Sequence, residues 1–206
     1  MSTTSLFPMF VKLPGRRCLV VGGGKVAEGK AESLLTSGAA VVVVAPEVTD
    51  KIATWVREQR LVWHSRGFQP ADLDGSFLVI AATRADGINE SVFREAEARG
   101  ILCNTVDEPE RCHFYYPAVV RRGRLQIAIS TGGLSPALAS RLRQELEEQF
   151  GPEYERWLEE LGAMRRDTFA RRLDPQRRAG LLKRLASRQG YERFLRSKRR
   201  RTGGSA

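Results

Sequence analysis

The chain has 206 residues, of which 42% are hydrophobic, so it is long enough to bury the core of one large domain. No apolar run approaches the ~20 residues of a membrane-spanning helix, and the N-terminus lacks the basic and apolar segments of a signal peptide. The formal net charge of +10 lies almost entirely in residues 151–206, where 16 Lys or Arg face 7 Asp or Glu. This asymmetry indicates a polyanionic partner, either a nucleic acid or a small molecule with many carboxylates.

The first predicted elements surround a glycine-rich turn. An apolar strand over 18–21 leads into the pattern G-x-G-x-x-A, formed by Gly22, Gly24 and Ala27. A helix follows, because apolar side chains recur at helical spacing from Ala27 onward, and Gly38 ends it. Such glycines let the pyrophosphate of a dinucleotide approach backbone N–H groups at a helix start. A strand before and a helix after the motif favour this interpretation over a glycine-rich turn with no ligand.

Strands and helices then alternate along the chain. We predict further strands over 40–44, 61–64, 76–83 and 101–106, with helices over 49–60 and from 88 to Gly100. The continuous β-branched run over 40–44 is typical of a buried parallel strand. This alternation predicts an α/β fold with a doubly wound parallel sheet, here a Rossmann NAD-binding domain over residues 1–113.

The pattern changes after residue 113. Two strands, 116–121 and 124–130, flank a short turn, and a helix begins at Ser135-Pro136 with Ser135 as its N-cap. An isolated two-stranded ribbon is marginal in water, so we assign 114–150 to a small α+β dimerisation region that pairs with a symmetric copy. Residues 151–206 form a basic helical domain, with a disordered tail expected from Lys198.

The residues after the second strand bear on the choice of cofactor. In a dinucleotide-binding fold an acidic residue usually holds the ribose 2′-hydroxyl at this strand tip. Here the strand ends at Ala45, and the nearest acid, Glu47, is displaced from that position. No Lys or Arg stands at the tip to bind a 2′-phosphate, so NAD is favoured over NADP.

Polar residues follow the later strands, where ligands of open α/β sheets bind. Thr83 ends one strand, and Asn104, Thr105 and Asp107 end the next. A carboxylate at Asp107 would face the nicotinamide and could remove a proton as hydride leaves. The alternative, favoured by the residues alone, is an Asp that hydrogen-bonds its own backbone in a turn.

Histidines, cysteines and a second glycine turn give weaker signals. The only histidines, His64 and His113, are too few for a multi-histidine metal site, and we predict no metal; His113 could approach Asp107. The turn Thr131-Gly132-Gly133 could bind an anion at a helix start or be a flexible connection. Three cysteines without C-x-x-C spacing indicate reduced thiols, so we expect a cytoplasmic protein.

Together these residues resemble the NAD-dependent precorrin-2 dehydrogenase family. That family includes the N-terminal half of bacterial fused siroheme synthases and a yeast bifunctional dehydrogenase–ferrochelatase. The resemblance runs from residue 7 to about residue 150, and its last two blocks make it specific. The matching blocks are Phe7-Pro8-Met9-Phe10, Val20–Ala27, Ala81-Ala82-Thr83, Cys103–Asp107, Phe114–Ala118 and Ser130–Ala139.

The resemblance implies a homodimer that oxidises precorrin-2 to sirohydrochlorin with NAD⁺, on the way to siroheme, and it leaves iron insertion open. Asp107 falls on the family's key carboxylate, and Lys25-Val26 and Pro46-Glu47 fall on its NAD-contacting positions. We predict a cofactor site of Gly22, Gly23, Gly24, Lys25, Val26, Ala27, Pro46, Glu47, Thr83, Asn104 and Thr105. The predicted substrate-binding residues are Thr131, Gly132 and His113.

Two other functions remain open. An NAD-sensing regulator would bind DNA through the basic C-terminal helices, but no recognition-helix pattern is present and the blocks at Phe114 and Thr131 stay unexplained. A chelatase with a vestigial NAD site is disfavoured by the retained glycines. We therefore expect no nucleic-acid or membrane partner, and precorrin-2, a polycarboxylate that suits the basic helical region, as the substrate.

Overall fold

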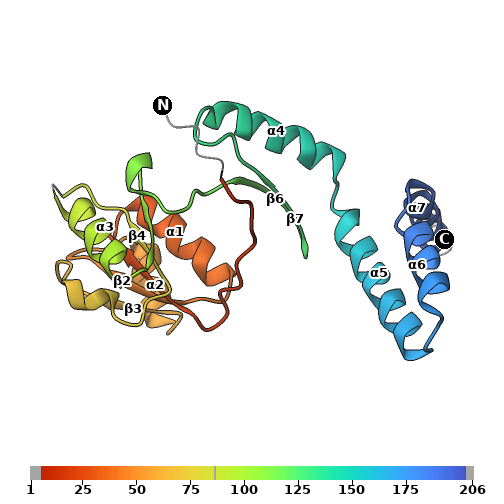
Figure 1. Cartoon of the computed structure of the whole chain (residues 1–206), viewed down its shortest axis with the longest axis horizontal. Helices are drawn as coiled ribbons and strands as arrows, with labels where there is room; N and C mark the ends of the chain where they lie inside the picture. Colours follow the sequence, from red (N-terminus) through yellow and green to blue (C-terminus); the bar gives the residue numbers. More distant parts are fainter. Residues whose placement is uncertain (1–5, 86, 203–206) are drawn as a thin grey trace. The chain divides into compact units, whose positions relative to one another are not determined.

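The computed structural model of the chain describes residues 6–85 and 87–202, with side chains described as far as residue 197. It divides into two compact units, Met1–Tyr116 and Pro117–Ala206 (Figure 1). The first unit corresponds to the expected dinucleotide-binding domain, residues 1–113, and extends a few residues beyond it. The second holds most of the expected dimerisation region together with the helical region, and the three-part division stays a prediction.

The first unit is built on a five-stranded parallel sheet with the strand order β3-β2-β1-β4-β5. The strands are β1 (Arg17–Val21), β2 (Ala40–Val44), β3 (Leu61–His64), β4 (Leu78–Ala81) and β5 (Leu102–Thr105). This topology confirms the doubly wound α/β fold. The chain adds β2 and β3 on one side of β1 and returns to add β4 and β5 on the other. The topological switch point therefore lies between β1 and β4, where ligands of such sheets bind.

Alternate residues of β1, β2 and β4 pack into separate cores on the two faces of the sheet. On one face, strand residues such as Val20 and Val43 pack with α1 (Lys25–Thr36) and α2 (Asp50–Arg57). On the other face, residues such as Val21 pack with α3 (Ile88–Ala98). Because both faces are covered, β2 and β4 are continuous apolar runs and not alternating ones.

Local sequence places most of the helix ends. Gly38 and Gly100 follow α1 and α3 with φ of +78° and +66°, as expected for glycines that end helices. The Thr49 side chain caps α2. This helix stops three residues before Arg60, the expected end, because Gln59 adopts a left-handed φ of +57°. Two short 3₁₀ helices were not among the expected elements: η1 (Pro70–Leu73) and η2 (Pro109–Arg111).

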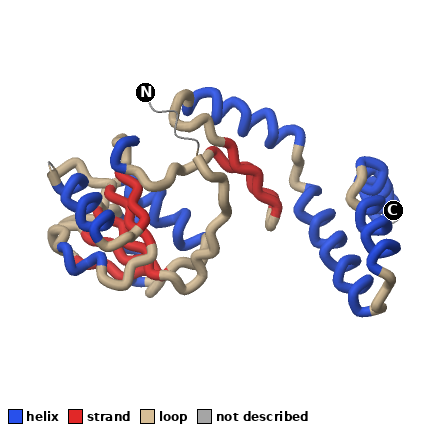
Figure 2. The backbone as a smooth tube through the Cα atoms, viewed as in Figure 1, coloured by secondary structure: helices blue, strands red, loops and turns tan. Residues whose placement is uncertain are grey.

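The second unit combines an antiparallel ribbon with helices (Figure 2). The ribbon consists of β6 (Ala118–Arg122) and β7 (Leu125–Ile129), and the helices are α4 (Pro136–Gln149), α5 (Glu153–Ala170), α6 (Pro175–Leu185) and α7 (Arg188–Thr202). Both α4 and α5 contact the ribbon, and α6 contacts α5 and α7. The Ser135 hydroxyl accepts the Leu138 N–H at 3.2 Å, which confirms the expected cap of α4.

The C-terminal end of the chain differs from the expectation. The backbone of α7 is helical through Thr202, which corrects the expectation of a disordered tail for residues 198–202. The rest of the expected tail, residues 203–206, lies outside the described residues. The helix continues because residues 191–202 contain neither glycine nor proline, the strongest helix breakers.

Candidate functional site

One row of paired residues brings the predicted site segments together. Val21 of β1 pairs with Val44 of β2 and with Ala81 of β4, and Ala81 pairs with Thr105 of β5. The residues that follow them therefore lie along one edge of the sheet. These segments are the glycine turn 22–24, residues 45–47, residues 82–83 and residues 106–107. The carboxyl edge of the parallel sheet thus gathers the predicted cofactor and catalytic residues.

The three glycines of the first turn are needed for different reasons. A Cβ on Gly22 would overlap the Ala82 carbonyl oxygen, and one on Gly23 would overlap the Glu47 carbonyl oxygen. Those two glycines are required by the packing of the chain against itself. A Cβ on Gly24 would meet no protein atom within 4 Å. Gly24 therefore leaves open space at the start of α1.

The start of α1 offers unpaired donors to that space. Gly24 is the N-cap residue and provides no side-chain cap, and the helix begins with the bond from the Glu28 N–H to the Gly24 carbonyl oxygen at 2.9 Å. The N–H groups of Lys25–Ala27 consequently lack acceptors within the helix. The positive end of the helix dipole adds to their attraction for anions. The turn therefore fits the pyrophosphate of a nicotinamide dinucleotide.

The other predicted cofactor residues divide into exposed and buried groups. Lys25, Val26, Pro46 and Glu47 are exposed at this edge, whereas Ala27, Asn104 and Thr105 are buried. The Asn104 amide donates to the Phe114 carbonyl oxygen at 2.8 Å, so it holds the chain segment after β5. The Thr105 hydroxyl lies 3.9 Å from the Cys103 sulfur. The buried residues thus support the site from within the protein.

A buried carboxylate, Glu28, ties the glycine turn to the loop after β2 and was not predicted. It lies in the first turn of α1 with 8% of its surface exposed. A hydrogen bond from Thr49 lowers the pKa of Glu28, and Lys25, 3.1 Å away, contributes in the same direction. The Thr49 N–H also donates to the Gly23 carbonyl oxygen at 3.0 Å. The loop that carries Glu47 is thereby anchored beside the cofactor turn.

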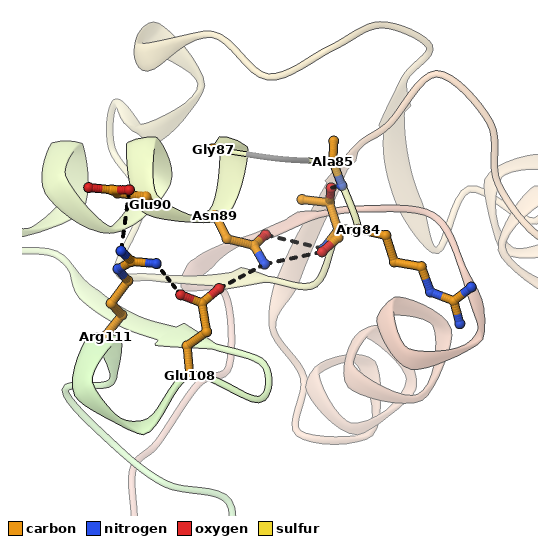
Figure 3. Close-up of a pocket in the computed structure, with 8 residues that line it drawn as sticks. Arg84, Ala85, Gly87, Asn89, Glu90, Glu108 and Arg111 are labelled. Carbon is orange, nitrogen blue, oxygen red and sulfur yellow. Dashed lines mark hydrogen bonds and ion pairs between the residues drawn. The ribbon is translucent and has the colours of Figure 1, made fainter.

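A polar cavity of about 260 Å³ opens beyond β4 and β5 (Figure 3). The Asn89 side chain accepts from the Thr83 N–H at 3.3 Å and donates to the Thr83 carbonyl oxygen at 3.1 Å, which holds the turn after β4. Arg111 pairs with Glu108 and, at 3.2 Å, with Glu90, so one guanidinium joins two carboxylates in this wall. The lining residues are Thr83, Arg84, Ala85, Gly87, Asn89, Glu90, Glu108 and Arg111.

Asp107 lines a second cavity, of about 180 Å³, between α1 and the segment after β5. The residue is exposed and has a φ of +62°, a left-handed conformation that Asp adopts more readily than most residues. Strained backbone of this kind occurs at active sites as well as in turns. Lys30 lines the same cavity, with its ammonium 3.6 Å from the centre of the Tyr116 ring. Neither Lys30 nor Tyr116 was predicted as a site residue.

The predicted substrate residues lie elsewhere. The His113 Nδ1 accepts the Cys103 N–H at 3.0 Å, and its ring contacts Phe93. His113 does not line the Asp107 cavity. Thr131 and Gly132 belong to the second unit, where the Thr131 hydroxyl accepts the Ser135 N–H at 3.2 Å in the turn before α4. Their roles in substrate binding stay predictions.

The cysteines are unmodified thiols. All three are free, and burial raises the pKa of Cys18 and of Cys103 to about 11, so both are protonated at neutral pH. Within residues 6–85 and 87–202, no group of three or more His, Cys, Asp or Glu side chains is arranged to hold a metal ion. In the same part of the chain no helix has the length and apolar character needed to span a bilayer.

Comparison with family models defines the class of the protein. A model described as putative NAD(P)-binding matches residues 9–118, and one described as the central part of the sirohaem biosynthesis protein matches residues 122–149. The fold and the glycine turn thus belong to a nicotinamide-dinucleotide-binding protein. More particularly, the chain belongs to the family of precorrin-2 dehydrogenases and siroheme synthase N-terminal regions.

Individual relatives agree with this assignment. A siroheme synthase of Methylobacillus flagellatus is 47% identical over 140 residues, which cover 68% of this chain and 30% of the relative. One of Xylella fastidiosa is 41% identical over 201 residues, covering 93% of this chain and 42% of the relative. The chain thus spans less than half the length of these curated relatives. The solved structure named SirC, precorrin-2 dehydrogenase, matches with a TM-score of 0.78 at 29% identity, covering 89% of this chain and 91% of that one.

Proposed function

We propose that the protein is a precorrin-2 dehydrogenase that oxidises precorrin-2 to sirohydrochlorin with NAD⁺. The observation that carries this proposal is the structural likeness to a precorrin-2 dehydrogenase over 89% of the chain, with a TM-score of 0.78. The sheet edge that joins the Gly24 turn to Asp107 supports it, because a dehydrogenase needs a dinucleotide and a base at one site.

NAD⁺ is proposed over NADP⁺ because of the residues around the tip of β2. When bound, NAD⁺ supplies the acceptor for a hydride. Glu47 is exposed beside the glycine turn, and the Pro46 carbonyl oxygen accepts a hydrogen bond from Ser65 at 3.1 Å. The next residue, Arg66, is bound to Asp72 and is not free to hold a 2′-phosphate. We expect substantially higher turnover with NAD⁺ than with NADP⁺, and equal turnover would contradict this preference.

Asp107 is the proposed general base. The oxidation removes a hydride, which carries two electrons, and a proton from the substrate. Asp107 stands exposed at the carboxyl end of β5, in a cavity large enough to admit part of a substrate, and its carboxylate would accept the proton. The left-handed backbone places this residue in a protruding turn beyond the strand.

Substrate capture is assigned to cationic and anion-binding groups. We propose that Thr131 and Gly132, at the start of α4, and His113 contribute contacts to the tetrapyrrole. The basic residues of α5–α7 attract its carboxylates by long-range electrostatics. The alternative is that the same helices bind DNA. Salt-sensitive binding of the protein to duplex DNA would favour that alternative.

A homodimer is the proposed assembly. The β6–β7 ribbon has only two strands, which is marginal by itself, and two leucines near it in the chain are exposed: Leu134 in the turn before α4, with 91% of its surface exposed, and Leu138 in the first turn of α4. A symmetric copy would cover these apolar side chains. The cytosol is the proposed compartment, which the three free thiols support.

The decisive experiment incubates the protein with precorrin-2 and NAD⁺ and follows the absorbance of NADH and of sirohydrochlorin. Stoichiometric formation of both supports the dehydrogenase, and no NADH above a protein-free control would overturn it. A parallel incubation with Fe²⁺ tests iron insertion, which the family resemblance leaves open. Siroheme formation beyond the protein-free rate would add this activity.

A further inference from the structure

Among the residues that the structure describes, Lys30 is the only lysine that lines the Asp107 cavity. Its side chain is half-buried, and its ammonium rests on the face of the Tyr116 ring, 3.6 Å from the ring centre. Among the described residues, this ammonium has no hydrogen bond or direct ion pair. Burial lowers the pKa of Lys30, which reflects the cost of holding a charge partly out of water. A cation–π contact offsets only part of that cost.

None of the acidic groups around Lys30 forms an ion pair with its ammonium in the described structure, so the ammonium can bind an anionic ligand. The titratable groups that share the cavity are Asp107, Glu108, Cys112, Tyr115 and Tyr116. Of these, Glu108 is paired with Arg111, and burial raises the pKa of Cys112, so that thiol is neutral at pH 7. Asp107 attracts Lys30 electrostatically, yet the two described side chains do not close into an ion pair.

We propose that Lys30 is a substrate-binding residue whose ammonium holds a carboxylate side arm of the tetrapyrrole, placing a ring C–H bond at Asp107. The inference rests on the proposed dehydrogenase function. A carboxylate is the expected ligand because the pyrophosphate already has its donors at Gly24, outside this cavity. A polycarboxylate entering a partly buried cavity needs a cation there, since an unpaired buried charge is costly.

This role for Lys30 predicts a change in KM for precorrin-2 without a change in kcat. A contact made equally in the ground state and the transition state changes KM and leaves kcat unchanged. Loss of a charge-assisted hydrogen bond should weaken binding by about 10- to 100-fold. Lys30→Met keeps an unbranched apolar stem of similar length and removes the ammonium group, with its charge and its hydrogen-bond donors. Lys30→Arg keeps the charge and should restore most of the affinity.

The test compares the wild-type chain with Lys30→Met and Lys30→Arg. Sirohydrochlorin is titrated into each protein by absorbance, and KM and kcat for precorrin-2 are measured across pH. Lys51→Met on α2 is the matched control, because it removes one positive charge that lies outside the cavity. We expect loss of sirohydrochlorin affinity and a raised KM in Lys30→Met alone, with NAD⁺ affinity unchanged in all variants.

Two results would overturn the assignment. One is unchanged sirohydrochlorin affinity in Lys30→Met. The other is a lower kcat at constant KM in Lys30→Met, together with a shift of the acidic limb of its profile of rate against pH. In that case Lys30 would act by keeping the Asp107 carboxylate ionised, and not by binding substrate. A wild type that neither binds sirohydrochlorin nor oxidises precorrin-2 would overturn the proposed function itself.

Labelling of the unmutated protein gives a second measurement that does not depend on how a variant folds. Lysines are reductively methylated with and without sirohydrochlorin, and each site is quantified by mass spectrometry. Bound ligand should protect Lys30 and leave Lys51 unaffected. Equal labelling of Lys30 in both samples, under conditions where the ligand is bound, contradicts the assignment.

Discussion

Gly24 differs from its neighbours because its missing Cβ leaves space that no protein atom fills. Gly24→Val should therefore abolish NAD⁺ binding while the melting temperature stays within a few degrees of the wild type. Its φ of −79° is accessible to any residue, so the substitution adds no backbone strain. Calorimetric titration with NAD⁺ and thermal unfolding give the two readouts.

Gly22→Ala is the matched control for Gly24→Val. Its new Cβ would overlap the Ala82 carbonyl oxygen, and its φ of +123° disfavours a side chain. We expect this variant to lose about 1–3 kcal/mol or more of folding free energy. Retained NAD⁺ affinity in Gly24→Val would disprove the assignment of the turn to pyrophosphate.

Asp107→Asn removes the basic oxygen at the proposed reaction centre. It should lower kcat for precorrin-2 by roughly 10²–10⁴-fold, the usual contribution of a general base, with NAD⁺ affinity unchanged. Asn is a suitable replacement because it also tolerates the left-handed φ of +62° found here. Near-normal turnover would leave Asp107 with only its role in the turn.

At the scale of single elements, an ion pair with a buried carboxylate and a partly exposed guanidinium holds the 3₁₀ helix η1. Asp72 accepts two hydrogen bonds from Arg66, at 2.6 and 2.8 Å, and one from the Gln69 N–H at 2.8 Å. These contacts, with the Arg66 bond the largest cause, lower the pKa of Asp72 in the folded protein. The ion pair joins two points of the segment between β3 and β4, and the Arg17 guanidinium of β1 donates to the Asp72 carbonyl oxygen at 3.1 Å, which links this segment to the sheet.

Asp72→Asn should destabilise the fold by about 1–3 kcal/mol at pH 7, as measured by urea unfolding. Because the folded-state pKa is lowered, the stabilisation is fully present above the unfolded pKa of about 3.9 and disappears as pH falls through the folded value. The difference between wild type and variant should accordingly shrink below pH 4. A difference that is constant between pH 7 and pH 3 contradicts this account.

A matched control for the ion pair is available on the surface. Glu58 pairs with Arg60 at 3.3 Å, with about half of each side chain exposed. Glu58→Gln should change the stability by less than about 1 kcal/mol, because solvent screens exposed pairs. The contrast separates the effect of burial from that of charge.

At the scale of the whole molecule, the proposed dimer follows from apolar surface in the second unit. Light scattering at micromolar concentration should give twice the mass of the 23.0 kDa chain. Leu134→Asp should shift the protein towards monomer, because Leu134 is exposed in the single chain and its loss costs the fold little. A wild-type monomer would rule out this assembly.

Removal of residues 152–206 tests the role of the basic helices. The truncated protein should show a much larger increase in the KM for precorrin-2 than in the dissociation constant for NAD⁺, since the cofactor turn belongs to the first unit. Added salt should weaken substrate capture by the full chain through screening. Unchanged dehydrogenase activity after truncation, together with tight DNA binding by the full chain, would favour the regulator alternative.

Local sequence signals predicted the sheet, its helices and the glycine turn because hydrophobic period, glycines and capping residues act over a few positions. The strand-to-helix context around Gly24 predicted the cofactor turn, whereas the residues around Asp107 alone favoured a role in a turn, and only the family resemblance made Asp107 the predicted catalytic carboxylate. The family resemblance rested on similarly short blocks. These features depend on neighbours along the chain, so the sequence alone was enough to recognise them.

Tertiary structure decided which side chains share a cavity. Lys30 comes from α1 and Asp107 from the end of β5, 77 positions apart in the chain, and only the strand order brings them together. Tertiary structure likewise brings together Glu28 and Thr49, and it places the His113 ring where its Nδ1 accepts the Cys103 N–H. Burial, pairing and pKa depend on which elements meet in space, and no local pattern encodes that pairing.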